Sequence, residues 1–238
     1  MDRAVTSSDV PQRAELGRLM LAACVAGLAI GLVVSGFRLV LETGDHFRNA
    51  FLGDAASWGT PGLLAAIGLA AAAVAAAAWM VQSFAPDAAG SGIPRVQAVL
   101  AEELPPASTK TALVKFVAGS LAMGAGLAVG REGPSVQIGA IVARLSGSIL
   151  GVSSRLATPI IAAGAGAGFA AAFAAPVAGA IFGVEALVRR LDAWTSAAIL
   201  VACVAAAWAG QFVLGSAAEV KTPLPITFEP SQLPQYVL

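Results

Sequence analysis

The stretch GREGPSVQIGA, residues 130–140, places an arginine, a glutamate and a proline between two apolar segments. LVKFVAGSLAMGAGLAV, residues 113–129, precedes it, and IVARLSGSIL, residues 141–150, follows it. Glycine allows close backbone approach and proline suits the first turn of a helix. The stretch therefore predicts a helix that begins near Pro134, directly after a charged break in an apolar chain.

The composition indicates an integral membrane protein. Of the 238 residues, 58% are hydrophobic and 12% are charged, whereas soluble domains carry about 25% charged residues. The mean hydropathy of +0.81 agrees. The net charge of zero gives no reason to expect a nucleic-acid partner. Cys24 and Cys203 stand alone in apolar stretches, so neither a metal site, a disulfide framework nor another cofactor is expected.

Apolar blocks of unequal length divide the chain. Three reach the roughly 20 residues that a membrane-spanning helix needs, at residues 19–41, 61–84 and 195–214. Further helical pieces, several of them short and separated by glycine and proline, are expected at 92–100, 110–129, 134–150, 157–174 and 177–187. Residues 42–60, which hold the only histidine, His46, are expected to form a polar loop. Close helix contacts are expected at Gly27-xxx-Gly31, Gly126-xxx-Gly130 and Gly164-xxx-Gly168.

Two of the breaks resemble each other. GSGIP, residues 90–94, and GREGP, residues 130–134, both place glycine before a proline at a helix start. Non-helical backbone survives at membrane depth only where it is buried in protein or lines a wet cavity. A helix N-terminus offers unpaired N–H groups that suit an anion, and Ser91 adds a hydroxyl. Either break alone could be a capped turn at the membrane surface, but two of them favour an anion pathway.

Glu132 is the most informative residue of the second break. A carboxylate at membrane depth costs about 2.5–3.5 kcal/mol on insertion scales and usually marks a transport pathway. At a helix N-terminus the same N–H groups stabilise either this carboxylate or a free anion. The two would compete for one site, and protonation of Glu132, or its movement away, would open that site. The sequence therefore predicts a gate.

GSGIP, GREGPSVQIGA and GAGAGFAAAFAAPVAGAIFGVEAL, residues 164–187, resemble the CLC family of chloride channels and H+/Cl− exchangers, over residues 15–215. The resemblance implies an all-α integral membrane protein with a CLC-type fold of tilted and broken helices, the first of two inverted-topology halves. Residues 19–214 would be the N-terminal half of the membrane domain. Residues 1–18 would be a cytoplasmic segment, and residues 215–238 a Pro-rich loop or tail.

The resemblance also implies roles for individual residues. Glu132 would be the gating glutamate, which passes protons in exchangers of the family. Lys115 would add positive potential, with a helix-terminal or membrane-edge role as the alternative, and Glu185 would support the pathway through structural hydrogen bonds. The anion-binding groups would be Ser91, Gly92, Ile93, Arg131 and Gly133.

Two departures from the family pattern qualify this expectation. Many exchangers carry a second glutamate where this chain has Ala186, which argues against tight proton coupling and leaves proton movement through Glu132 open. A GxFxP motif and a pathway tyrosine belong to the second half of the family's membrane unit, and the only tyrosine here, Tyr236, lies in the tail. These residues are therefore expected to hold half of the anion site. Either the chain is a fragment of a longer CLC protein, or the other half comes from a partner chain, which would be a homodimer partner with contacts in 177–214 or a complementary C-terminal half.

The expected function is transport of chloride or another small anion, in a lipid bilayer, across the cell membrane. The alternatives are a non-conducting assembly or regulatory subunit and a fluoride-selective relative, although Ser91 favours the chloride type. An enzyme is not expected, because the single His46 has no nucleophile partner and no GxGxxG phosphate-binding loop is present.

Overall fold

The computed structural model describes residues 13–188 and 192–215, and these residues form helices and turns with no strand. The all-α prediction is therefore confirmed. The predictions for the N-terminal segment up to residue 12 and for the tail from residue 216, Tyr236 included, lie outside the described residues. The elements are α1 Arg13–Ser57, α2 Thr60–Phe84, η1 Pro86–Ala88, α3 Ile93–Leu100, α4 Thr109–Gly124, α5 Glu132–Ile149, η2 Ser154–Leu156, α6 Ala157–Phe173, α7 Pro176–Phe182, the π-helical η3 Gly183–Val188 and α8 Ala193–Leu214.

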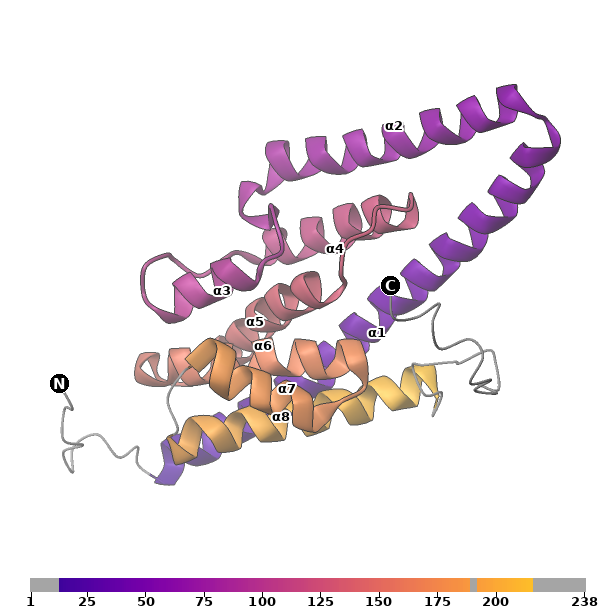
Figure 1. Ribbon diagram of the computed structural model, residues 1–238. Coiled ribbons are helices and arrows are strands. Elements are labelled where there is room, and N and C mark those ends of the chain that lie inside the picture. The colour runs from indigo at the N-terminus through magenta and orange to yellow at the C-terminus, as the bar shows by residue number, and fades with distance from the viewer. Residues whose placement is uncertain (1–12, 189–191, 216–238) are drawn as a thin grey trace, which may run out of the picture.

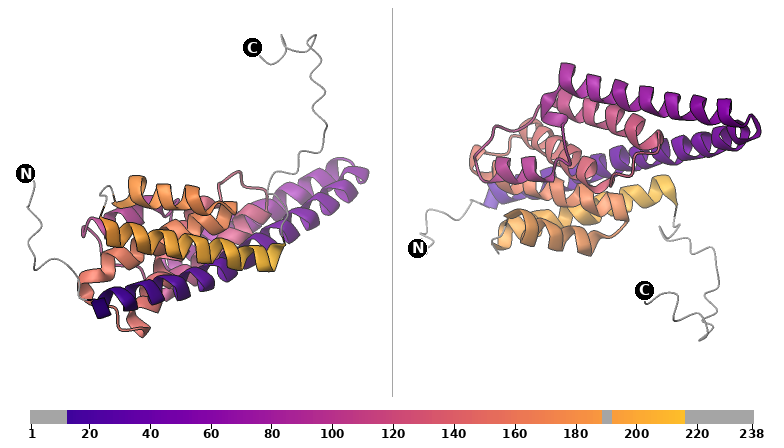
Figure 2. Two further views of the ribbon diagram at one scale, coloured as in Figure 1. Left: turned by 90° about the horizontal axis from the view of Figure 1, so that it is seen from below. Right: turned by 45° about the horizontal axis from the view of Figure 1, so that its top comes forward.

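The core forms around α6, a helix built largely of alanine and glycine. Its residues from Ile160 to Gly168 are all buried. It packs against α5, α8 and α1, and α8 in turn lies along α1 (Figures 1 and 2). Small side chains suit this position because they let three neighbouring helices approach the same axis.

Two of the predicted glycine pairs mediate close helix contacts. Gly27 and Gly31 of α1 face α8 so tightly that an added Cβ would overlap the backbone oxygens of Ala202 and Ala206. Gly164 and Gly168 of α6 face α5 in the same way, where an added Cβ would overlap backbone atoms of that helix. The backbones themselves are in contact at both crossings, so these predictions are confirmed.

The third pair, Gly126-xxx-Gly130, was wrongly predicted as a helix contact. The helix α4 ends at Gly124, and Gly126 adopts φ 99°, a left-handed conformation that a continuing helix does not allow. Residues 125–130 instead form the connection that carries the chain into α5. Spacing alone did not distinguish a helical glycine pair from two glycines in a loop.

The helices differ in length as the apolar blocks predicted. Four segments are long and apolar enough to cross a membrane: Arg13–Ser57, Thr60–Phe84, Ser154–Phe173 and Ala193–Leu214. The eight residues of α3 extend only about 12 Å at 1.5 Å per residue, far less than the roughly 30 Å of a hydrocarbon core.

The predicted polar loop at 42–60 is wrong, because α1 continues as a helix to Ser57. Its charges are satisfied along the helix surface: Arg38 lies 3.9 Å from Glu42, and Arg48 lies 2.6 Å from Asp45. Such pairs three and four residues apart support a helix that composition alone describes as polar. Its apolar residues, Phe47 and Phe51 among them, line a cleft of about 680 Å³ toward α2 and α4.

The α2 helix lies at the periphery. It returns along the extended end of α1 and lies beside α4 (Figure 1; Figure 2, right). Of its 25 residues only Gly62 and Ala77 are buried. Since the exposed side chains are apolar, this surface fits lipid or another polypeptide better than water.

The α1–α8 contact yields a stability prediction with an internal control. Gly31→Ala should lower the free energy of unfolding by about 1–3 kcal/mol, because the new methyl group overpacks a contact between backbones. Gly36→Ala on the same helix, where an added Cβ meets nothing within 4 Å, should change it by less than about 1 kcal/mol. Unfolding of both variants in detergent micelles tests this, and equal effects would contradict it.

Candidate functional site

The two proline-glycine breaks meet in space. Gly133, in the first turn of α5, lies against Ser91 so closely that an added Cβ would overlap the Ser91 backbone oxygen and lie 2.7 Å from its Oγ. Gly92 adopts φ 95°, and a Cβ there would lie 2.6 Å from Gln137 Oε1. Only glycine at positions 92 and 133 allows this approach.

Both breaks end in a helix N-terminus without a side-chain cap. Gly92 precedes α3 and Arg131 precedes α5, and neither side chain accepts a hydrogen bond from the helix it precedes. The first N–H groups of a helix have no partner within the helix. Two sets of backbone donors are therefore available close to Ser91 and Glu132.

A cleft of about 650 Å³ opens beside this junction. Ser91, Lys115 and Glu132 all line it, together with apolar side chains of α2 and α4. A hydroxyl, a carboxylate and an ammonium group thus share one otherwise apolar cleft.

Glu132 also lines a second, more polar cleft of about 590 Å³, which contains Glu42, Asp45, Arg48 and Arg131. Its carboxylate folds back over Gly130, where any side chain would overlap it. Within the described part of the chain, no hydrogen bond or ion pair to this carboxylate occurs. Glu132 therefore lies at the boundary between two clefts, with nothing in the described structure that fixes its carboxylate.

Arg131 is half-buried, and its guanidinium carbon lies 5.9 Å from the centre of the Phe173 ring. This distance fits a cation–π contact. The contact places the positive charge on the side of the second cleft, which Phe173 also lines.

Lys115 is 5% exposed, and its ammonium group is committed to backbone oxygens. Nζ donates to Ala88 O at 2.8 Å and to Gly90 O at 2.5 Å. Lys115 thus ties α4 to the segment that leads into Ser91.

Two further predicted residues are Ile93, directly after Gly92, and Glu185. Ile93 is the first residue of α3 and packs against the hydrophobic core. Glu185 lies on η3, is exposed, and lines neither of the two clefts that contain Glu132. Its support of the pathway stays a prediction.

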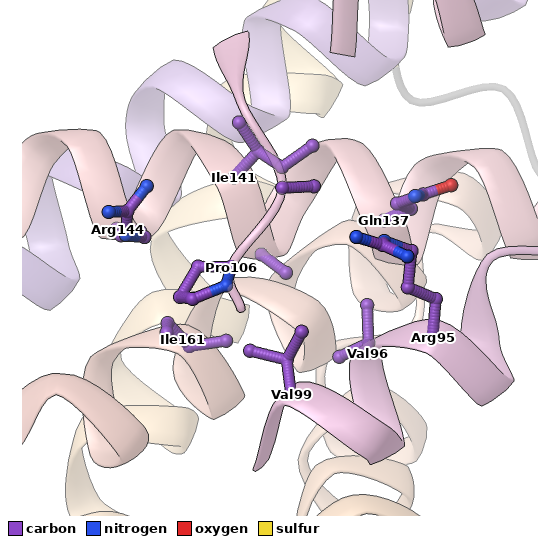
Figure 3. A pocket seen from close by; sticks show the side chains of 10 residues that line it. Arg95, Val96, Val99, Pro106, Gln137, Ile141, Arg144 and Ile161 are labelled. Atoms are coloured by element: carbon purple, nitrogen blue, oxygen red, sulfur yellow. The ribbon is translucent and has the colours of Figure 1, made fainter. Parts of the chain in front are cut away.

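Three residues of the site were not predicted from the sequence: Asp87, Arg95 and Gln137. Gln137 is 1% exposed, and its Nε2 donates to Asp87 O at 2.8 Å. Arg95 Nη2 lies 2.9 Å from Asp87 Oδ2. In Figure 3, Arg95 and Gln137 lie at one end of the small pocket between α3 and α5, and Arg144 lies at the other. The available signal was an amide side chain among the apolar residues of VQIGAIVA, residues 136–143.

Comparison with known proteins assigns the family. The family model described as "Voltage gated chloride channel" matches residues 71–238. The H(+)/Cl(-) exchange transporter ClcA of Vibrio vulnificus is 37% identical over 168 residues, which are 70% of this chain and 36% of that protein. This chain therefore spans only about a third of the length of that curated relative.

Solved structures share this fold. A slow cyanobacterial Cl−/H+ antiporter matches with a TM-score of 0.79 and 32% identity, over 84% of this chain and 48% of that one. A CLC-type fluoride/proton antiporter matches with a TM-score of 0.72 and 26% identity, over 96% of this chain and 55% of that one. The predicted membrane architecture is confirmed, and the chain belongs to the voltage-gated chloride channel, or CLC, family of integral membrane proteins.

Proposed function

We propose that this chain forms part of a pathway that carries chloride across the cell membrane and that Glu132 gates it. The observation that carries the proposal is the position of Glu132, which lines both the cleft of Ser91 and the polar cleft beside it. The relative from Vibrio vulnificus is named as a H(+)/Cl(-) exchange transporter. Transport, rather than catalysis, is the activity that these relatives support.

The gate follows from charge. Glu132 is the first residue of α5, and a negative charge is favoured at a helix N-terminus. A chloride ion in the Ser91 cleft is favoured by the same donors, so the ionised carboxylate and the anion exclude each other. Protonation removes the competing charge. An anion then passes from one cleft to the other.

The donors of the anion site would be the Ser91 hydroxyl and the backbone N–H groups of Gly92, Ile93 and Gly133. Ser91 and Gly133 are already in contact, so donors from α3 and α5 converge within one small region. Arg131 and Lys115 add positive charge on either side of Glu132. Convergent donors and an apolar lining are what an anion site at membrane depth requires.

Proton movement would use Glu132 as its carrier. The carboxylate reaches both clefts, so a proton gained on one side can be lost on the other. Position 186 carries alanine and offers no second carboxylate. We therefore expect chloride movement that responds to pH but is only loosely coupled to protons.

The described residues supply only part of the proposed site. The chain covers 36% of its curated relative and 48% of the cyanobacterial antiporter, and both Glu132 clefts are open. The rest would belong to a longer protein of which this sequence is a piece, to a second copy, or to a complementary C-terminal half.

Replacing the gate gives the central test. Glu132→Gln should abolish the dependence of chloride flux on pH, because the amide resembles the protonated carboxyl and cannot ionise. Flux from liposomes that contain the purified chain is measured at several external pH values. Glu103→Gln, an exposed glutamate that lines neither cleft, is the matched control and should behave as wild type.

Three results of this assay would count against the proposal. If the flux of Glu132→Gln depends on pH as in wild type, Glu132 is not the gate. Fluoride flux well above chloride flux would favour the fluoride-selective alternative. The similar structure of a CLC-type fluoride/proton antiporter is the reason to measure it. Absence of flux from folded wild-type protein would count against transport by this chain alone, and would leave a requirement for the complementary half or the non-conducting subunit as the explanation.

Removal of the serine hydroxyl should weaken anion binding. Ser91→Ala is expected to raise the chloride concentration for half-maximal flux roughly two- to tenfold, which corresponds to one lost hydrogen bond of about 0.5–1.5 kcal/mol. Ser148→Ala is the control, because Ser148 is exposed at the opposite end of α5 and its hydroxyl donates to Leu145 O at 2.7 Å. Equal half-saturation in Ser91→Ala and wild type would exclude the hydroxyl from the site.

The exposed face of α8 is our candidate for contact with a second copy. Leu200, Val204, Trp208 and Phe212 recur every four residues and are 49–84% exposed. Truncating Trp208 and Phe212 to alanine should convert a dimer to monomer, since buried aromatic residues carry about 2 kcal/mol or more of interface energy each. Light scattering in detergent measures this, with Leu64→Ala plus Ile67→Ala on α2 as the control. A dimer that survives the α8 change would move the interface elsewhere.

A further inference from the structure

In the segment that leads into Ser91, four oxygen-bearing groups are bonded to side chains of other helices. These are the backbone carbonyls of Asp87, Ala88 and Gly90 and the side-chain carboxylate of Asp87. Oxygens directed at a bound anion would repel it, and the repulsion is strong where the surroundings are apolar. Where these oxygens point therefore matters as much as where the donors point.

Gln137 holds the first of them. Its side chain is 1% exposed, and Nε2 donates to Asp87 O at 2.8 Å. Its Oε1 accepts no hydrogen bond from the described residues, so the donated bond is the amide's one polar link within that part of the chain. Gly92 makes room for it, since a Cβ at position 92 would lie 2.9 Å from Gln137 Cβ.

Lys115 holds the next two. Its buried ammonium group bonds to Ala88 O and Gly90 O from the α4 side. Ala89 lies between them, with its own N–H bonded back to Pro86 O at 3.0 Å. A cation that collects two carbonyls draws their negative ends toward itself and away from the next residue, Ser91.

Arg95 holds the carboxylate. Its Nη2 lies 2.9 Å from Asp87 Oδ2, with 20% of the arginine side chain exposed. Asp87 is thus bound twice, through its side chain by α3 and through its backbone by α5. The three carbonyls and the carboxylate are therefore bonded to donors from three different helices.

We propose that Gln137 is a positioning residue for the anion site and that, together with Lys115 and Arg95, it keeps the bonded oxygens of Asp87, Ala88 and Gly90 turned away from the anion. The backbone N–H groups of Ser91 and Gly92 have no acceptor among the described residues and remain for the ligand. The inference rests on the proposed chloride pathway. Gln137 would therefore act on the anion site without contacting the anion, through the backbone of the segment that leads into Ser91.

Gln137→Met tests this, because methionine keeps the length of the side chain and removes the donor. Gln97→Met is the matched control: Gln97 Nε2 also donates to a backbone carbonyl, Ala186 O at 3.1 Å, but on η3 instead of the Ser91 loop. Gln137→Glu is a second variant. Glutamate has the shape of glutamine, and its ionised carboxylate cannot donate to Asp87 O.

Two measurements distinguish an effect on the segment 86–93 from an effect on transport. Hydrogen exchange of residues 86–93 in detergent reports the loop alone and needs no flux. Chloride-dependent flux gives the half-saturating concentration and the maximum. Gln137→Met should speed exchange in this segment and raise the half-saturating chloride concentration about fivefold, as expected for one hydrogen bond, with the maximum flux nearly unchanged. Gln97→Met should do neither.

Each result is decisive. Unchanged exchange at 86–93 in both Gln137 variants would overturn the inference whatever the flux. Faster exchange with unchanged half-saturation would show that the loop is held but that holding it does not position the anion, which also overturns it. Wild-type protein that neither carries nor binds chloride would refute the proposed function, and the positioning role with it.

Discussion

Backbone that leaves a helix within a membrane has to find a partner for each polar group, because lipid offers none. In this chain the constraint falls on residues 87–92 and 130–133, where two helices begin beside one cleft. The oxygens and the N–H groups of this backbone are treated differently. Side chains of α3, α4 and α5 bond to oxygens of Asp87, Ala88 and Gly90, while backbone donors at the two helix starts have no acceptor within the described part of the chain.

This arrangement depends on small residues. Ser91 and the first turn of α5 are in contact only because position 133 has no side chain. The α5 helix is fixed in turn by its crossing with α6, where Gly139 meets Gly164 backbone to backbone. Glycine therefore acts at two levels, as the hinge of the breaks and as the spacer that lets the helices behind them approach. A methyl group at either level would separate the donors that the anion site needs.

Much of the fold could be predicted because each break has a chemical cause. Pro134 follows a glycine, and Pro176 cannot continue the helix that ends at Phe173, so the starts of α5 and α7 were predicted within a few residues. The extension of α1 to Ser57 was missed, because the i,i+3 pairing of Asp45 with Arg48 makes charged residues good helix formers. A prediction from composition alone assigns the same charged residues to a loop. The tie between Gln137 and Asp87 was also missed, since it joins positions 50 residues apart, and local patterns carry no information on such pairs.

Two charged side chains share the Ser91 cleft, and their surroundings indicate different functions. A charge removed from water is stable only when bonded. Lys115 meets this requirement fully, with two carbonyl acceptors and almost no exposure, so moving it would break the loop that it holds. Glu132 does not meet it: its carboxylate is half-buried, has no donor among the described residues and borders two clefts. The proposed gated pathway would use this difference: the bonded cation of Lys115 would keep the cleft attractive to an anion, and the unbonded carboxylate of Glu132 would decide when the anion site is empty.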